Sequence, residues 1–104
     1  QTSGNHRPYT IPDDNHGFKV QDKQLAEVEP YGFRSVADYN SFRYLDQSIG
    51  YYIDLLKKED YSQNTLFFFF GDHGNERQVK HRRPAEEQLL LTDYHVPFLI
   101  YSPG

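Results

Sequence analysis

The stretch NTLFFFFGDHG, residues 64–74, decides the fold class of this chain. Its apolar run, Leu66 to Phe70, is unbroken and lies between turn-forming residues. An apolar run without alternation is typical of a strand that is buried on both faces, as the strands of parallel sheets are. We therefore expect a buried strand that ends at Gly71, followed by a turn that contains Asp72 and His73.

The residues before this strand predict one long helix from about Ser35 to Lys58. Ser35 is a good N-cap, and the negative charge of Asp38 suits the positive end of a helix dipole. Apolar residues recur with the helical period and would form one stripe, namely Phe42, Leu45, Ile49, Tyr52, Ile53 and Leu56. Within this helix, Gly50 is expected to allow close packing against a sheet.

The residues after the strand predict a short helix around Ala85–Leu91, with Pro84 at its start, and a last strand over Val96–Tyr101. Helix, buried strand, short helix and buried strand in this order indicate an α/β layer with parallel strands. In such sheets, binding sites form at the carboxyl ends of the strands. This rule makes the turn at Asp72 and His73 the candidate site.

The first 34 residues have a different character, because glycines, prolines and an Asp-Asp-Asn run interrupt them. Long ordered loops in compact domains tend to be functional. We interpret residues 1–34 as an active-site loop region and residues 35–104 as a helix-strand-helix-strand segment.

The composition excludes several classes of protein. A net charge of −4 argues against a nucleic-acid-binding protein, because phosphate backbones require a basic surface. The longest apolar run is far short of the roughly 20 residues that span a bilayer. The absence of cysteine excludes disulfides and thiolate metal ligands. With 104 residues, the chain is long enough for one small domain.

Asp72 and His73 form the strongest local motif for chemistry. A carboxylate and an imidazole side by side offer an oxygen and a nitrogen donor to a divalent cation. The flanking Gly71 and Gly74 permit the backbone conformation that brings both side chains to one side. The alternative is that Asp72 caps the following turn and that His73 is an ordinary polar residue.

A second motif, TSGNHRPYTIP, spans residues 2–12. A His followed by an Arg in a proline-stiffened loop is a reasonable site for an oxyanion. Arg offers planar, multidentate hydrogen bonds, and His can donate a hydrogen bond or a proton to a phosphate or sulfate. The alternative is that His6 and Arg7 belong to an ordinary surface loop.

Together, these motifs resemble the sulfatase branch of the alkaline phosphatase superfamily. The order TSGNHRPYTIP, a long Tyr-rich helix, NTLFFFFGDHG and YHVPFLIYSPG (residues 94–104) is most similar to lipoteichoic acid synthase-like proteins. The resemblance implies a fragment of an alkaline phosphatase-like layered α/β fold, with parallel buried strands and one long helix. It also implies that residues 1–104 are a C-terminal part of the catalytic domain.

The resemblance assigns roles residue by residue. Asp72 and His73 match the adjacent Asp and His that bind a divalent metal ion (manganese, zinc, calcium or magnesium) in the family. His6 matches the His that contacts the phosphate group of the substrate, and Arg7 lies next to it. The nucleophile and an upstream acidic metal ligand lie N-terminal to His6 in the family and are absent from this chain. We therefore expect these 104 residues alone to be inactive.

The implied intact protein is a metal-dependent enzyme that acts on phosphate or sulfate esters. A phosphoglycerol transferase is the leading hypothesis, a sulfuric ester hydrolase is the second, and a non-catalytic binding module that kept the fold is the third. Such enzymes face the outside of the bacterial cell membrane or the periplasm, behind membrane helices that this chain lacks. The substrate stays open, because residues 75–83 match neither family continuation. Their basic cluster, Lys80–Arg83, could add anion contacts or form a solvated patch.

Overall fold

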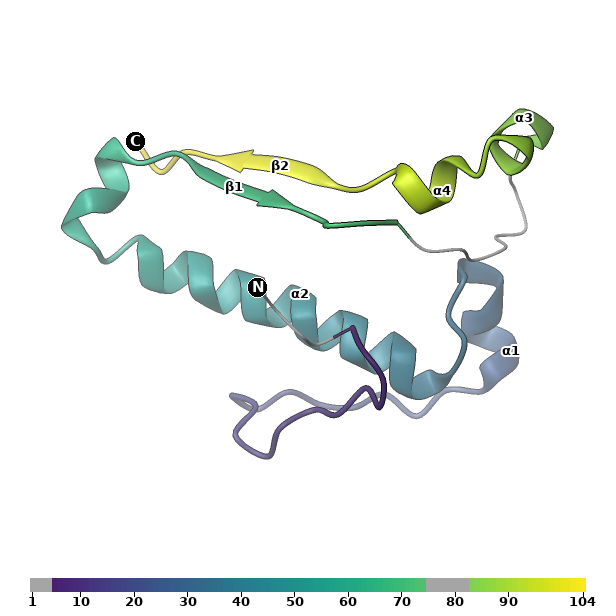
Figure 1. Ribbon diagram of the computed structural model, residues 1–104. Helices are drawn as coiled ribbons and strands as arrows, with labels where there is room; N and C mark the ends of the chain where they lie inside the picture. Colours follow the sequence, from purple (N-terminus) through teal and green to yellow (C-terminus); the bar gives the residue numbers. More distant parts are fainter. Residues whose placement is uncertain (1–4, 75–82) are drawn as a thin grey trace. The chain divides into compact units, whose positions relative to one another are not determined.

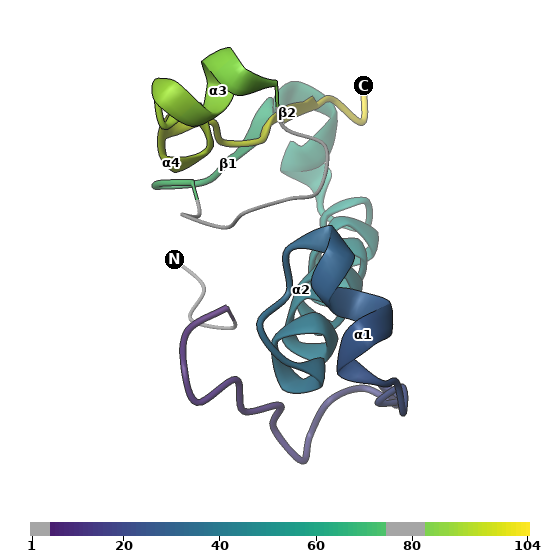
Figure 2. The ribbon, with the colours of Figure 1, turned by 90° about the vertical axis from the view of Figure 1, so that its right-hand side faces the viewer.

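The computed structural model describes residues 5–74 and 83–104. The chain divides into two compact units, Gln1–Ile53 and Asp54–Gly104, and each unit is described by itself. The longest element is the helix α2 (Val36–Leu56), which Figures 1 and 2 show from two directions.

An irregular segment precedes the helices of the first unit. Residues 5–24 contain no helix or strand, as expected for the loop region. The short helices α1 (Leu25–Val28) and η1 (Glu29–Tyr31, a 3₁₀ helix) follow, so only part of the expected loop region is irregular.

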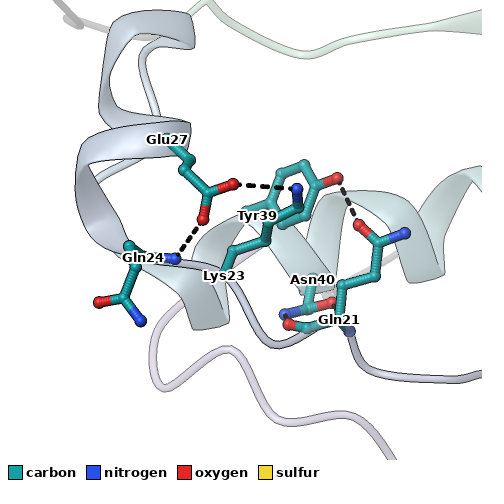
Figure 3. A network of polar contacts seen from close by, with 6 residues as sticks. All are labelled: Gln21, Lys23, Gln24, Glu27, Tyr39 and Asn40. Carbon is teal, nitrogen blue, oxygen red and sulfur yellow. Dashed lines mark hydrogen bonds and ion pairs between the residues drawn. The ribbon is translucent and has the colours of Figure 1, made fainter.

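The start of α1 is fixed by the side chain of Glu27. Its Oε2 accepts a hydrogen bond from the backbone N–H of Gln24 at 2.7 Å, which satisfies a donor just outside the helix. Its Oε1 lies 3.1 Å from the Nζ of Lys23 in an exposed ion pair (Figure 3). A single carboxylate therefore holds the first turn of this short helix.

The start of α2 agrees with the prediction from the sequence. The Oγ of Ser35 accepts a hydrogen bond from the N–H of Asp38 at 3.1 Å, which is the contact expected of an N-cap serine. The carboxylate of Asp38 accepts a hydrogen bond from the N–H of Arg34 at 2.9 Å. Its charge lies in the first turn, where the helix dipole favours an anion.

The apolar stripe of α2 is covered only at its end. Leu56 is 3% exposed, whereas Phe42 and Tyr52 are about half exposed. Three polar side chains of α2 are at most 2% exposed: Asp38, Asn40 and Ser41. Within the described residues, the first half of α2 therefore buries a polar strip, which the hydrophobic pattern did not indicate.

The second unit is built around two strands, β1 (Phe67–Phe70) and β2 (Phe98–Tyr101). They pair antiparallel, with Phe67 opposite Tyr101 and Phe70 opposite Phe98 (Figure 1). Both strands lie within two residues of their predicted positions, which confirms this part of the prediction. Aromatic and β-branched residues favour extended backbone, so the apolar runs located the strands.

The expected parallel arrangement of these strands is wrong. The connecting segment leaves β1 and enters β2 at the same end, where the N–H of Gly71 donates to the carbonyl of Pro97 at 3.3 Å. A parallel pair would need a crossover that returns along the whole strand. The described part of the second unit is therefore an α/β arrangement with a two-stranded antiparallel sheet.

The expectation that both strands are buried on both faces is also wrong for this unit. Phe68, Phe70 and Phe98 are between 52% and 69% exposed. A sheet face is buried only where another layer packs on it. Among the described residues, no second layer covers these aromatic side chains.

The predicted helix after residue 83 is present in two pieces. The helix α3 (Pro84–Gln88) begins at the proline, as expected of a residue whose ring fits the first helical position. Leu90 has a left-handed backbone, with φ of 51°, and separates α3 from α4 (Leu91–Tyr94).

In the described part of the chain, no helix combines the length and the apolar character needed to cross a bilayer.

Candidate functional site

The turn after β1 brings the side chains of Asp72 and His73 together. The Nε2 of His73 lies 3.9 Å from the Oδ1 of Asp72. The two side chains are accessible to a ligand, since Asp72 is 71% and His73 is 65% exposed. The N–H of Gly74 donates to the carbonyl of Asp93 at 2.8 Å and so attaches the turn to α4.

Asp72 also serves the turn itself. Its Oδ1 accepts a hydrogen bond from the backbone N–H of His73 at 3.1 Å, which is the kind of contact that a turn-capping role predicts. A carboxylate has about four acceptor positions on two oxygens. One bond to the backbone therefore orients the Asp72 side chain without using up its capacity to bind a cation.

The ring of His73 is oriented by a contact of its Nδ1. Nδ1 lies 2.8 Å from the carbonyl oxygen of Gly74. When a neutral ring donates from Nδ1, the lone pair is on Nε2, which is the nitrogen that faces Asp72. Histidines that bind metal ions usually have the other ring nitrogen hydrogen-bonded in this way. The Gly74 carbonyl, and after it the charge of Asp72, raise the pKa of His73 above its ordinary value.

This pair of donors fits a divalent cation but does not complete a site. A carboxylate and an imidazole are both common ligands of such ions, and a closed zinc site needs four ligands. Over residues 5–74 and 83–104, no group of three or more His, Cys, Asp or Glu side chains lies close enough to hold an ion. An ion at this turn would need further ligands from water or from residues beyond the described ones.

His6 and Arg7 lie in a tight turn of the first unit. The N–H of Tyr9 donates to the carbonyl of His6 at 2.8 Å, and the peptide bond between Arg7 and Pro8 is cis. Both side chains are exposed, and neither has a hydrogen bond or ion pair with another described residue. Their donors are therefore available to an anion. This turn belongs to the first unit and the Asp72–His73 pair to the second.

Asn40 of α2 is the main contact between the helix and the irregular segment. Its Oδ1 accepts a hydrogen bond from the N–H of Gln21 at 2.8 Å, and its Nδ2 donates to the Gln21 carbonyl at 2.9 Å. Nδ2 also donates to the Val36 carbonyl, and Oδ1 also accepts from Arg43 at 3.0 Å. The amide is therefore fully bonded in a buried position. Figure 3 shows Asn40 and Tyr39 together on the side of α2 that faces Gln21.

The contacts with α2 continue along residues 15–19. They pair, in order, Arg43 with Lys19, Tyr44 with Phe18, Gln47 with Asn15, and Tyr51 with His16. Counted from Asn40, these helix residues stand at i+3, i+4, i+7 and i+11, which is the spacing of one side of a helix. The first half of these contacts uses Lys19 and Phe18 and the second half uses Asn15 and His16, so this part of the loop runs roughly antiparallel to the helix.

Ser41 contacts the other end of the loop. Its Oγ lies within hydrogen-bonding distance of the Oδ1 of Asn5, at 3.4 Å, and of the Asp38 carbonyl, at 3.1 Å. Asn5 is the residue before His6. Asn40 and Ser41 were not among the predicted site residues, although one signal was available. Both residues favour caps and turns over helix interiors, so their presence inside a predicted helix suggests a bonding role.

One predicted feature cannot be located. Residues 80–82 of the basic cluster Lys80–Arg83 lie outside the described residues, and the described Arg83 is exposed.

Comparisons with known proteins agree with the resemblance in the sequence. The family model described as sulfatase matches residues 1–104. Lipoteichoic acid synthase 1 of Bacillus subtilis (strain 168) is 27% identical over 111 residues. That match covers 99% of this chain and 16% of the relative, so the chain spans only a small part of the relative's length. No solved structure matches the chain.

Proposed function

Because this chain belongs to the sulfatase family, we propose that it forms part of the catalytic domain of a metal-dependent enzyme acting on phosphate or sulfate esters. The observation that carries the proposal is the pairing of Asp72 and His73 at the end of β1. A carboxylate oxygen and an imidazole nitrogen lie 3.9 Å apart, both accessible. The contact between Nδ1 and the Gly74 carbonyl orients the ring with Nε2 toward Asp72.

In this proposal, Asp72 and His73 hold a divalent ion of manganese, zinc, calcium or magnesium. The bound ion would supply Lewis-acid chemistry, lowering the pKa of a nucleophile and neutralising charge on the ester. The contribution of this chain is orientation. The N–H of His73 fixes the Asp72 carboxylate, the Gly74 carbonyl fixes the ring, and Gly74 attaches the turn to α4. The nucleophile and the remaining ligands would come from residues that lie N-terminal to this chain in the intact protein.

His6 and Arg7 contact the oxyanion of the substrate in this proposal. Their exposed side chains have no polar partner among the described residues, so a phosphate or sulfate would not have to displace one. Arg7 supplies a permanent positive charge, whereas His6 can donate a hydrogen bond or a proton. Contacts that strengthen as charge develops on the oxyanion raise the rate of the chemical step.

The substrate that we favour is a phosphoglycerol lipid, with the enzyme acting as a transferase. Three exposed leucines, Leu89, Leu90 and Leu91, lie two to four residues before Asp93, whose carbonyl accepts a hydrogen bond from Gly74. An ester with an apolar tail would find apolar surface beside this turn. The alternative is a sulfuric ester hydrolase, which the description of the matched family favours. Either enzyme would act on the outer face of the bacterial cell membrane or in the periplasm.

The proposal is tested by comparing His73→Ala with His6→Ala in the full-length protein. His73→Ala removes a ligand, so the purified protein should lose its ion and its activity together. His6→Ala should keep a normal metal content and lose turnover on the order of 100-fold, because it removes only a proton donor or charge-stabilising contact. The measurements are metal content by elemental analysis and kinetics on a phosphoglycerol lipid and on an aryl sulfate. His95→Ala, a change at another exposed histidine, is the matched control and should alter neither quantity.

Two outcomes would contradict the proposed roles. Loss of the ion in His6→Ala to the same extent as in His73→Ala would make His6 a ligand and not an anion contact. A full-length protein that has no metal-dependent activity on either substrate would favour a non-catalytic binding module. In that case, the residues preceding this chain should lack a Thr, Ser or Cys after a strand.

A further inference from the structure

We propose that Asn40 and Ser41 are positioning residues that hold the His6 loop, residues 5–21, in the conformation required for catalysis. The inference rests on the role proposed above for His6. It goes beyond that role because neither Asn40 nor Ser41 contacts the substrate in this proposal. Each acts on the reaction only through the loop that carries His6.

The two ends of the His6 loop are attached to neighbouring positions of α2. Ser41 contacts Asn5 at the start of the loop, and Asn40 binds both backbone groups of Gln21 at its end. The loop is thus closed on the helix, as in compact surface loops whose ends lie close together. Fixing both ends reduces the number of conformations open to the residues between them.

The apolar contacts of the loop are too few to fix it alone. Among its described residues, Phe18 is the one buried hydrophobic side chain, and Val20 is 65% exposed. Burying one phenylalanine offsets the conformational entropy of only a few ordered residues. The polar contacts with α2 therefore add to the ordering of the loop. Asn40 supplies two of them, both below 3.0 Å, and the hydroxyl of Tyr39 donates a third to the Gln21 side chain at 2.8 Å.

The position of His6 depends on its backbone. The side chain has no hydrogen bond or ion pair with another described residue, so nothing else in the described structure fixes its direction. The residue next to it, Asn5, is the one that Ser41 contacts. A displacement of about 1 Å in a catalytic group can lower a rate on the order of 100-fold. Loosening the loop should therefore reduce turnover while leaving the proposed metal ligands in place.

The test is a set of double-mutant cycles in the full-length, metal-loaded protein. Asn40→Ala and Ser41→Ala are each made in the wild type and in His6→Ala. Ser41→Ala is the milder change, because alanine favours a helix, and it decides the question if Asn40→Ala fails to fold. Ser48→Ala is the matched control, since the one described partner of the Ser48 Oγ is the Tyr44 carbonyl within the helix, at 2.8 Å. The measurements are kcat, KM, metal content and melting temperature.

We expect each variant to lower kcat about 10-fold in the wild type, with metal content and KM little changed. In His6→Ala, the same variants should have almost no further effect, because the group that they position is gone. A general loss of folded protein would instead lower activity by the same factor in both backgrounds, and that result would overturn the inference. An unchanged kcat in the wild type would overturn it as well. A fully active His6→Ala variant would refute the proposed role of His6. It would do so whatever the effects of Asn40→Ala and Ser41→Ala.

Discussion

Replacing Gly50 by alanine should stabilise the protein, although the sequence suggests the opposite. Gly50 lies inside α2, and an added Cβ would meet no atom of the described residues within 4 Å. The expected close packing of Gly50 on a sheet therefore finds no support there. Without a steric cost, the difference in helix propensity remains, which is about 1 kcal/mol in favour of alanine. A gain of 1 kcal/mol raises the melting temperature by roughly 2–8 °C, with the larger shifts in smaller domains.

Gly17→Ala is the matched control, because Gly17 has the same open surroundings as Gly50 but a different backbone conformation. Gly17 also has no atom within 4 Å of an added Cβ, but its φ is +76°. A left-handed backbone costs an alanine roughly 1–2 kcal/mol, so this variant should melt at a lower temperature. Thermal unfolding followed by circular dichroism at the helix band measures both. A Gly50→Ala variant that melts below the wild type would refute the reasoning, since it would mean that a surface packs tightly against Gly50.

Two further variants test the helix starts. Ser35→Ala removes the N-cap bond to the Asp38 N–H and should lower the free energy of unfolding by about 1 kcal/mol in urea denaturation, whereas Ser48→Ala should not lower it. The Gln24 N–H, and after it Lys23, lower the pKa of Glu27 below its ordinary value of 4.5. Glu27 therefore stabilises the fold above that pH, and its contribution is lost as the pH falls through the lowered pKa. The difference in stability between the wild type and Glu27→Gln should be constant above about pH 5 and should shrink in more acidic solution; a constant difference down to about pH 2 would contradict this linkage.

The candidate site was predictable where it depends on local chemistry. Asp72 and His73 are adjacent in the sequence and lie just after an apolar run, so a turn that exposes both side chains follows from the strand ending at Gly71. The hydrogen bond between His73 and the Gly74 carbonyl was not predictable, because it depends on the ring rotamer. Asn40 and Ser41 were missed for a different reason. Their partners, Gln21 and Asn5, are 19 and 36 residues away along the chain.

Interactions between neighbouring residues set the elements of this protein and the chemistry of its motifs. The N-cap at Ser35, the proline at the start of α3 and the aromatic run of β1 all act locally, so their effects can be predicted without knowing the fold. The direction in which β2 pairs with β1, and the face of α2 that is buried, became known only from the folded chain. Both depend on contacts between distant residues. An apolar run indicates that a surface can be buried, but only the packing of the chain decides what covers it.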